Sequence, residues 1–324
     1  MKTSYLFTVI LFVFLAHTTT TFAQEATEEP AFFTGISPII LERNAAEVSL
    51  MNNMSSFWLA LRRYNPSLQV TQVSDRERYT RAENILRVTY GFSKKKNWDL
   101  GAEFKYSNAR LDNAARSSPF RVYRAQNEVT EDFFTRDNSY HGLATIGLRL
   151  RGTPLKSVPE LTLQATYYQP VAQTISDRYA FGADRVQTGL SATYFIKSGE
   201  NMYYFFQADF ATYLSSKQNN INFRSHYTDF VPSISTFAVI NTWEDQWYIF
   251  PGLNYSTTLS SSFYRLSQQF FGTLGVFYQP KKTFSVLLNW QIPFILDSGT
   301  RNVEFVRNSY SGFTLGLRTL IEPR

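Results

Sequence analysis

The side chains best suited to acid–base or nucleophilic chemistry in this sequence are His141 and His226. A serine nucleophile requires its hydroxyl to lie within hydrogen-bond reach of a histidine that takes up its proton. Neither of these histidines is followed by a serine within two positions. The chain contains no cysteine, which excludes thiolate nucleophiles, thiolate metal ligands and disulfides. The pattern therefore predicts that the protein is not an enzyme.

Sequence patterns for metal and phosphate binding are also missing. The chain has no HExxH pair for zinc and neither GxGxxG nor GxxxxGK[ST] for phosphates. Glu128, Glu131, Asp132 and Asp137 gather oxygen ligands of the kind that calcium prefers, but their spacing matches no calcium-binding loop. A solvated acidic loop is the favoured interpretation. We predict no metal and no cofactor.

Composition is mildly basic and rich in aromatic residues. The formal net charge is +6, and ordinary surface lysines and arginines account for it, so we predict no nucleic-acid partner. Hydrophobic residues make up 44% and aromatic residues 17% of the chain, yet the mean hydropathy is only −0.25. This combination suits a protein in which half of each strand faces lipid and half faces water.

Segments that alternate apolar and polar residues would position the polar side chains of this chain. Between residues 79 and 92, Leu86, Val88 and Tyr90 lie on one face and Arg87 lies on the other. A period of two indicates a β-strand, because an amphipathic helix would repeat its apolar positions every three to four residues. The predicted strands are 47–63, 79–92, 98–110, 138–151, 159–170, 185–197, 201–214, 227–241, 247–259, 263–279, 283–296 and 305–321.

The links between the predicted strands are alternately short and long. The turns 93–97 and 198–200 are tight, whereas the loop Leu111–Asp137 is the longest and is expected outside the cell. Transmembrane β-barrels have this arrangement, and an even number of strands brings both chain ends to one side. We predict an all-β fold: a transmembrane antiparallel up-and-down β-barrel of about 12 strands. A β-sandwich or a soluble barrel is the alternative.

Two further details concern the first hairpin and the aromatic residues. The alternation slips near Asn52 and Asn53, which predicts a β-bulge, and the polar segment Tyr64–Arg78 is predicted as the first long loop.

Aromatic residues near the short turns predict a girdle at the membrane interface. They are Tyr90, Phe92, Trp98, Tyr194, Phe195, Tyr203, Tyr204, Trp243, Trp247, Tyr248 and Tyr278.

Residues 1–23 have the pattern of a secretory signal peptide. Lys2 supplies the positive start, Tyr5–Ala16 is apolar apart from Thr8, and small residues precede a cleavage point after Ala23. The apolar stretch is shorter than the about 20 residues that a membrane-spanning helix needs, although a retained anchor is the alternative. The predicted parts are a signal peptide (1–23), a periplasmic N-terminal segment (24–45) and the barrel (46–321).

The leader, the alternating strands and the closing segment Tyr310–Leu317 resemble an outer-membrane β-barrel of Gram-negative bacteria, of porin or transporter type. The closing segment has a glycine followed by alternating hydrophobic residues, and so is similar to the assembly signal of that class. It departs from the class in that seven residues follow Leu317. The leader's Phe22-Ala23-Gln24 ending is similar to that of Bacteroidota barrels. The resemblance implies the outer membrane as location, with lipid, lipopolysaccharide and the barrel-assembly machinery as partners.

Charged residues alternate with the aliphatic face that is expected to contact lipid. On the lipid face at mid-depth an arginine would cost about 2–4 kcal/mol, whereas the lumen offers water and counter-charges. The excess of basic residues predicts a ladder that favours anions. The alternative is that these residues pair with carboxylates and fill the barrel, or lie outside the membrane at the turns. The candidate lumen-lining residues are Arg87, Glu103, Lys105, Arg149, Arg151, Arg185, Asp209 and Arg318, with Lys197 on the same face.

The expected function is a narrow passive channel or uptake pore for small solutes, with anions favoured. Barrels of eight strands are filled by side chains and those of 16–18 strands hold an open channel, so twelve strands leave a constricted path. A filled barrel with a structural or surface-binding role is the alternative. The twelve-stranded outer-membrane phospholipases pair a histidine with a serine two positions later, which this chain lacks, so an enzyme ranks third. The solute, the gating and the oligomeric state stay open.

Overall fold

The computed structural model describes residues 40–65, 70–93, 97–112, 120, 138–171, 185–199, 201–215, 228–243, 246–262, 265–297 and 303–322. The predicted signal peptide, residues 24–39 and most of the predicted loop Leu111–Asp137 lie outside these ranges. So does His226, and the side chain of His141 is likewise not described. Within the described ranges, no helix is long and apolar enough to cross a membrane.

Twelve strands make up the described part of the chain, and each follows a stretch of alternating sequence. They are β1 (Ala46–Asn65), β2 (Val70–Gly91), β3 (Trp98–Asp112), β4 (Asn138–Gly152), β5 (Leu161–Pro170), β6 (Gln187–Ser198), β7 (Met202–Tyr213), β8 (Asp229–Trp243), β9 (Trp247–Ser260), β10 (Arg265–Lys281), β11 (Phe284–Asp297) and β12 (Val303–Ile321). We call the end of the barrel with the links 199–201 and 282–283 the turn end. The opposite end, with the link 113–137, is the loop end.

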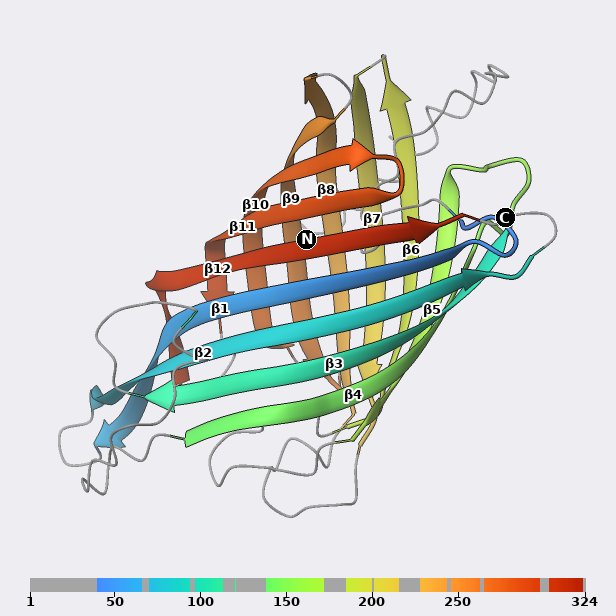
Figure 1. Cartoon of the computed structure of the whole chain (residues 1–324). Helices are drawn as coiled ribbons and strands as arrows, with labels where there is room; N and C mark the ends of the chain where they lie inside the picture. The colour runs from blue at the N-terminus through green and yellow to red at the C-terminus, as the bar shows by residue number, and fades with distance from the viewer. Residues whose placement is uncertain are drawn as a thin grey trace, which may run out of the picture. The chain divides into compact units, whose positions relative to one another are not determined.

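The last strand pairs with the first and closes the sheet into a barrel. β1 and β12 run antiparallel, with Leu50 opposite Leu317 and Ala46 opposite Ile321. Figure 1 shows blue β1 between red β12 and cyan β2, so the two ends of the chain meet in one sheet. Every neighbouring pair is antiparallel and follows chain order. This confirms the predicted fold, a closed twelve-stranded up-and-down barrel.

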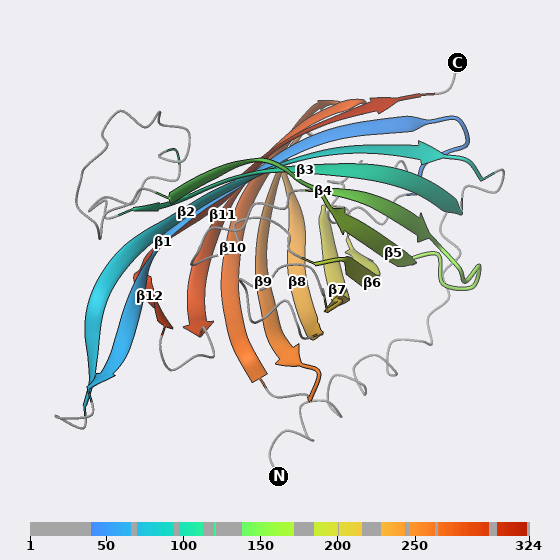
Figure 2. The same cartoon turned by 90° about the horizontal axis from the view of Figure 1, so that it is seen from below.

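The barrel has two walls that face each other across the lumen. In Figures 1 and 2, β12 and β1–β4 form one wall, and β7–β9 lie on the opposite side. We refer to these as the front wall and the back wall. Closure gives every strand one outward face and one lumenal face, and successive side chains alternate between them.

Large apolar side chains remain exposed on the outward face of all twelve strands. Leu190 is 65% exposed and Trp290 63% exposed. An apolar surface of this extent is untenable in water, and it matches the band that transmembrane barrels present to lipid. The band includes Leu50, Leu86, Leu100, Phe104, Leu148, Leu163, Leu190, Phe206, Ile234, Leu253, Leu274, Leu288, Trp290 and Leu315.

The first hairpin is longer than predicted. β2 begins at Val70, so most of the segment Tyr64–Arg78, predicted as a loop, is strand, and Asn65 pairs with Val70. The sequence prediction is wrong here because the segment has no apolar face. Alternation arises where one face meets lipid, and a hairpin that continues beyond the apolar band keeps its backbone hydrogen bonds without that pattern.

The β-bulge predicted at Asn52–Asn53 is also absent. β1 pairs with β2 without interruption from Ala46 to Leu61. Asn52 Nδ2 donates a hydrogen bond to Asn84 Oδ1 of β2. The two amides share this hydrogen bond across the strand pair, so the polar residues are accommodated without a bulge. The register shifts occur later, after Ser56 toward β12 and after Leu61 toward β2.

Candidate functional site

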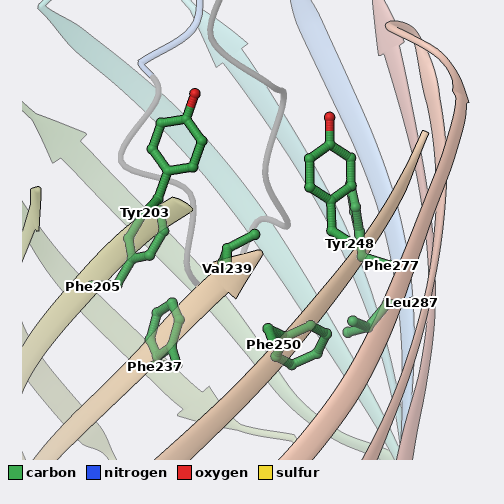
Figure 3. Packing of buried hydrophobic residues seen from close by; sticks show 8 residues of the cluster. All are labelled: Tyr203, Phe205, Phe237, Val239, Tyr248, Phe250, Phe277 and Leu287. Atoms are coloured by element: carbon green, nitrogen blue, oxygen red, sulfur yellow. The ribbon is translucent and has the colours of Figure 1, made fainter. Parts of the chain in front are cut away.

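Aromatic and aliphatic side chains fill the lumen at the turn end of the back wall and the strands that follow it. Phe205 and Phe237 stack with ring centroids 5.0 Å apart at an interplanar angle of 12°. Figure 3 shows side chains from five consecutive strands gathered in one group. Their burial excludes water and narrows the lumen at this level. The aromatic cluster consists of Tyr203, Phe205, Phe237, Val239, Tyr248, Phe250, Phe277 and Leu287.

One glycine makes room for this cluster. A Cβ atom built at Gly275 of β10 would lie 1.8 Å from the ring of Phe250. Gly275 pairs with Phe250 across β9 and β10, so the ring of Phe250 lies directly over the glycine backbone. The bare backbone therefore lets the aromatic ring lie flat against the barrel wall.

The front wall carries buried charges at the level where the back wall is aromatic. Arg87 of β2 donates two hydrogen bonds to Glu103 Oε2 of β3, from Nε at 2.8 Å and from Nη2 at 2.6 Å. Lys105 Nζ lies 3.5 Å from Glu103 Oε1 and 3.9 Å from the ring centroid of Tyr168 on β5. One carboxylate thus pairs with two cations, which leaves the group with one net positive charge, and an aromatic face contacts the second cation.

Two further ion pairs lie on the same wall. Arg151 Nη2 lies 2.6 Å from Asp99 Oδ2, and both side chains are almost fully buried. Asp99 also accepts a hydrogen bond from the backbone N–H of Leu41, which holds the segment before β1 against the barrel. Arg318 of β12 pairs with Glu47 of β1 at 2.7 Å, across the seam that closes the sheet.

Arg149 lies between these pairs. Its Nη2 donates to Thr89 Oγ1 at 2.5 Å, spanning β3 from β4 to β2. It is 1% exposed and interacts electrostatically with Asp99 and Glu47 as well as with neighbouring arginines. The front wall therefore holds a continuous network of guanidinium and carboxylate groups rather than a row of isolated cations.

All eight candidate residues from the sequence lie on the lumenal side of the barrel, but the structure brings them together differently than expected. Arg87, Glu103, Lys105, Arg149, Arg151 and Arg318 share the front-wall network. Arg185 pairs with Asp229 at 2.9 Å near the loop end. Asp209 accepts hydrogen bonds from Gln207 and Ser233 on the back wall. Lys197 remains exposed near the turn end.

Sequence reasoning missed three acidic partners: Glu47, Asp99 and Asp229. Each is almost fully buried and faces an arginine. Each lies in the first two residues of a strand. At that position the sequence does not distinguish a lumenal strand residue from a solvated residue of the preceding turn. A buried carboxylate opposite a lumenal arginine is the expected neutralising partner.

The aromatic girdle is corrected in part. Tyr90, Phe92, Tyr204 and Trp247 are exposed on the outward face, and Trp247 stacks on Tyr278 with ring centroids 4.3 Å apart. In contrast, three of the residues assigned to the girdle face the lumen: Phe195, Tyr203 and Tyr248. Aromatic residues favour strands on either face, so position near a turn does not by itself indicate contact with lipid headgroups.

Polarity along the lumen changes from one end of the back wall to the other. On β9 the lumenal side chains from loop end to turn end are Thr258, Ser256, Asn254, Gly252, Phe250 and Tyr248. On β8 Ser235 accepts a hydrogen bond from Asn254 Nδ2 at 2.7 Å. The back wall is thus hydrophilic near the loop end and aromatic near the turn end.

A cavity of about 300 Å³ opens at the hydrophilic end of this gradient. It is lined by Arg185, Tyr213, Asp229, Val231, Ser256, Thr258, Ser267 and Gln269. The lining combines one ion pair, one phenol ring, hydroxyl groups and an amide. Among the described residues, no group of three or more His, Cys, Asp or Glu side chains could hold a metal ion.

Comparison with known proteins supports this architecture at the level of fold. No protein-family model and no curated protein matches the sequence. An outer membrane channel from Pseudomonas putida F1 has a TM-score of 0.59 and 12% identity, covering 88% of this chain and 98% of that chain. The fold is that of an outer-membrane β-barrel. The toluene transporter TbuX from Ralstonia pickettii, with a TM-score of 0.44 and 9% identity, covers 92% of each chain.

The outer-membrane barrel assignment agrees with the surface of the molecule. A closed sheet with an apolar outward face satisfies its backbone hydrogen bonds internally, which the interior of a bilayer requires. The β domain of a Bordetella autotransporter has a TM-score of 0.46 and 12% identity, over 85% of this chain and 99% of that chain. The closed barrel and its apolar outward band are those of a protein located in the outer membrane.

Proposed function

We propose that this outer-membrane barrel is a narrow passive channel for small polar solutes. The observation that carries the proposal is the polarity gradient along the back wall, which leads from the hydrophilic cavity at the loop end to the aromatic cluster at the turn end. A filled structural barrel has no need of an open hydrophilic cavity lined by polar side chains. Solutes would enter through that cavity and pass between the aromatic cluster and the front-wall charges.

The charge arrangement supports a weaker anion preference than the residue counts suggest. Arg87, Arg151 and Arg318 each face a carboxylate at hydrogen-bond distance. Paired charges give a smaller net field in the lumen than isolated ones. The front wall holds more basic side chains (Arg87, Lys105, Arg149, Arg151 and Arg318) than carboxylates (Glu47, Asp99 and Glu103), so we propose modest rather than strict selectivity for anions.

A filled barrel with a structural or surface-binding role remains the second candidate. It is favoured by the near-complete burial of the aromatic cluster together with the front-wall ion pairs. If these groups stay in place, the turn end is closed to solutes. Conductance separates the two candidates, because a closed barrel carries no current.

The decisive experiment measures single-channel conductance of the purified protein in planar bilayers. We expect small, stable current steps, and larger steps for Phe205→Ala combined with Phe237→Ala, since this change removes two stacked rings from the constriction. Phe206→Ala is the matched control, because this neighbouring ring is exposed on the outward face. Silence from both the native protein and the double variant would favour the filled barrel.

The remaining parts of the proposal concern partners and origin. The apolar band supports contact with outer-membrane lipid and lipopolysaccharide. The closing strand, with its glycine and alternating hydrophobic residues, supports recognition by the barrel-assembly machinery. The leader's Phe22-Ala23-Gln24 ending supports a Bacteroidota source.

A further inference from the structure

The hydrophilic cavity at the loop end has the properties of a binding site in addition to being an entrance. Its volume of about 300 Å³ lies at the lower limit of small-molecule sites, which span ~300–1,000 Å³. Its walls come from β7, β8, β9, β10 and the residue Arg185 just before β6. A rigid sheet therefore fixes the relative positions of the polar groups that line it.

Four polar side chains of the lining have unused hydrogen-bonding capacity. Ser256 and Thr258 of β9 lie beside Gln269 and Ser267 of β10, in the pairs Ser256–Gln269 and Thr258–Ser267. None of these four side chains makes a hydrogen bond within the part of the chain that the structure describes. Hydroxyl and amide groups both donate and accept, so the four offer a dense array for a ligand that does the same.

The two charged side chains of the cavity, Arg185 and Asp229, form an ion pair with each other. Arg185 Nη1 lies 2.9 Å from Asp229 Oδ2, with the two side chains only 10% and 5% exposed. A ligand that took either partner would leave the other buried without its counter-charge, which is unfavourable. The ion pair therefore makes the cavity electrically neutral, and this disfavours both an anion and a zwitterion as the preferred ligand.

The remaining lining residues provide modest apolar surface. The guanidinium of Arg185 lies 5.4 Å from the ring centroid of Tyr213, which orders this side of the cavity. Val231 adds a small apolar patch on β8. A ring of this kind beside hydroxyl and amide groups suits a solute that has many hydroxyl groups and a compact carbon skeleton.

We infer that this cavity is a binding site for neutral polyhydroxylated solutes, a monosaccharide or a similar polyol, on their way through the barrel. The inference rests on the proposed channel function and names the class of its solute. Ser256, Thr258, Ser267 and Gln269 donate and accept hydrogen bonds to the solute hydroxyls. The Arg185–Asp229 pair holds the cavity in shape and excludes charged competitors.

The test measures glucose binding to the full-length protein in detergent micelles by saturation-transfer NMR. We expect glucose to bind, and Gln269→Leu or Thr258→Val to weaken its binding about tenfold. Gln268→Leu is the matched control, because this neighbour alternates to the other face of the same strand. Gluconate, which carries similar hydroxyl groups and a carboxylate, and glycine, a zwitterion, should bind more weakly than glucose.

Several outcomes would overturn the inference. Equal loss of glucose binding in Gln269→Leu and Gln268→Leu would show that the lumenal amide is not a contact. Preferential binding of gluconate would make the cavity an anion site, and preferential binding of glycine would make it a zwitterion site. Conductance without glucose binding would leave the channel standing and remove the site, whereas glucose binding without conductance would support the site and contradict the channel.

Discussion

At the scale of single residues, the lumen is organised by the neutralisation of buried charge. Removing one partner of a buried ion pair leaves an unpaired charge in a low-dielectric environment, while replacing both partners by apolar residues is often tolerated. The Arg318–Glu47 pair shows this clearly, because both side chains are buried and they join the last strand to the first. The ion pair therefore stabilises the contact between β1 and β12 that closes the barrel.

Arg318→Met should destabilise the folded barrel by about 3–5 kcal/mol, since Glu47 stays buried without its partner. The double variant Glu47→Leu with Arg318→Met should recover most of the loss. Urea denaturation in detergent micelles measures both effects. Lys197→Met, at the exposed rim, serves as the control and should change little. Equal instability of single and double variants would contradict a role for the charge pair itself.

Replacing Arg149 and Arg151 together by glutamine should shift the ion selectivity of the channel toward cations. The change removes two lumenal positive charges and leaves Asp99 without its guanidinium partner. Reversal potentials across a KCl gradient measure the shift, which should grow at low ionic strength because screening acts over about 8 Å at physiological salt. The double lysine variant keeps the charge and should resemble the native protein. An unchanged reversal potential in the glutamine variant would leave these arginines as structural filler.

At the scale of elements, the links between strands divide the barrel into two unlike ends. Links at the turn end, such as 282–283, are minimal, whereas the link 113–137 between β3 and β4 is long. In transmembrane barrels the short turns face the periplasm and the long loops face the outside. The first hairpin adds length on the loop-end side, because β1 and β2 continue to Asn65 and Val70.

Single cysteines introduced at Ser118 and at Lys282 should differ in their reaction with a membrane-impermeant maleimide. Ser118, in the long link, should be labelled on intact cells, whereas Lys282 should react only after permeabilisation. The absence of native cysteine gives a clean background. Lys282 is exposed in the β10–β11 turn, so failure to label it on intact cells would reflect the membrane and not burial. The opposite labelling pattern would invert the topology.

At the scale of the whole molecule, closure of the sheet determines the stability of the protein in a bilayer or in detergent. A closed barrel has no free sheet edge and satisfies its backbone groups internally. Twelve strands enclose a space too large for one layer of small side chains, and this protein divides that space between an aromatic cluster, an ion-pair network and an open polar cavity.

The purified protein should therefore migrate faster on SDS gels before heating than after it, since the closed barrel resists SDS until heat opens it. Cell fractionation should recover the mature chain with the outer membrane. A soluble periplasmic protein, or one whose migration is insensitive to heat, would contradict the membrane assignment. β-rich circular dichroism in detergent provides the accompanying measure of folding.

The sequence by itself determined the architecture. Contact with lipid on one face of each strand requires apolar residues at every second position, and this alternation is visible in the sequence. Strands such as β3 and β11 follow the predicted ranges within a few residues, and Arg149 and Arg318, which were expected to face inward, are buried in the structure. The outer part of β2 was missed, since outside the lipid no such period is imposed.

Only the tertiary structure decided what the lumen contains. The pairing of Arg151 with Asp99 and of Arg318 with Glu47 depends on register between strands, which residue spacing does not reveal. Phe205 and Phe237 meet in the lumen for the same reason. The polar cavity combines residues from five segments, between 185 and 269 in sequence, that become neighbours only after the strands pair. Lumenal chemistry is set by strand register, whereas the fold is set by the lipid-facing pattern.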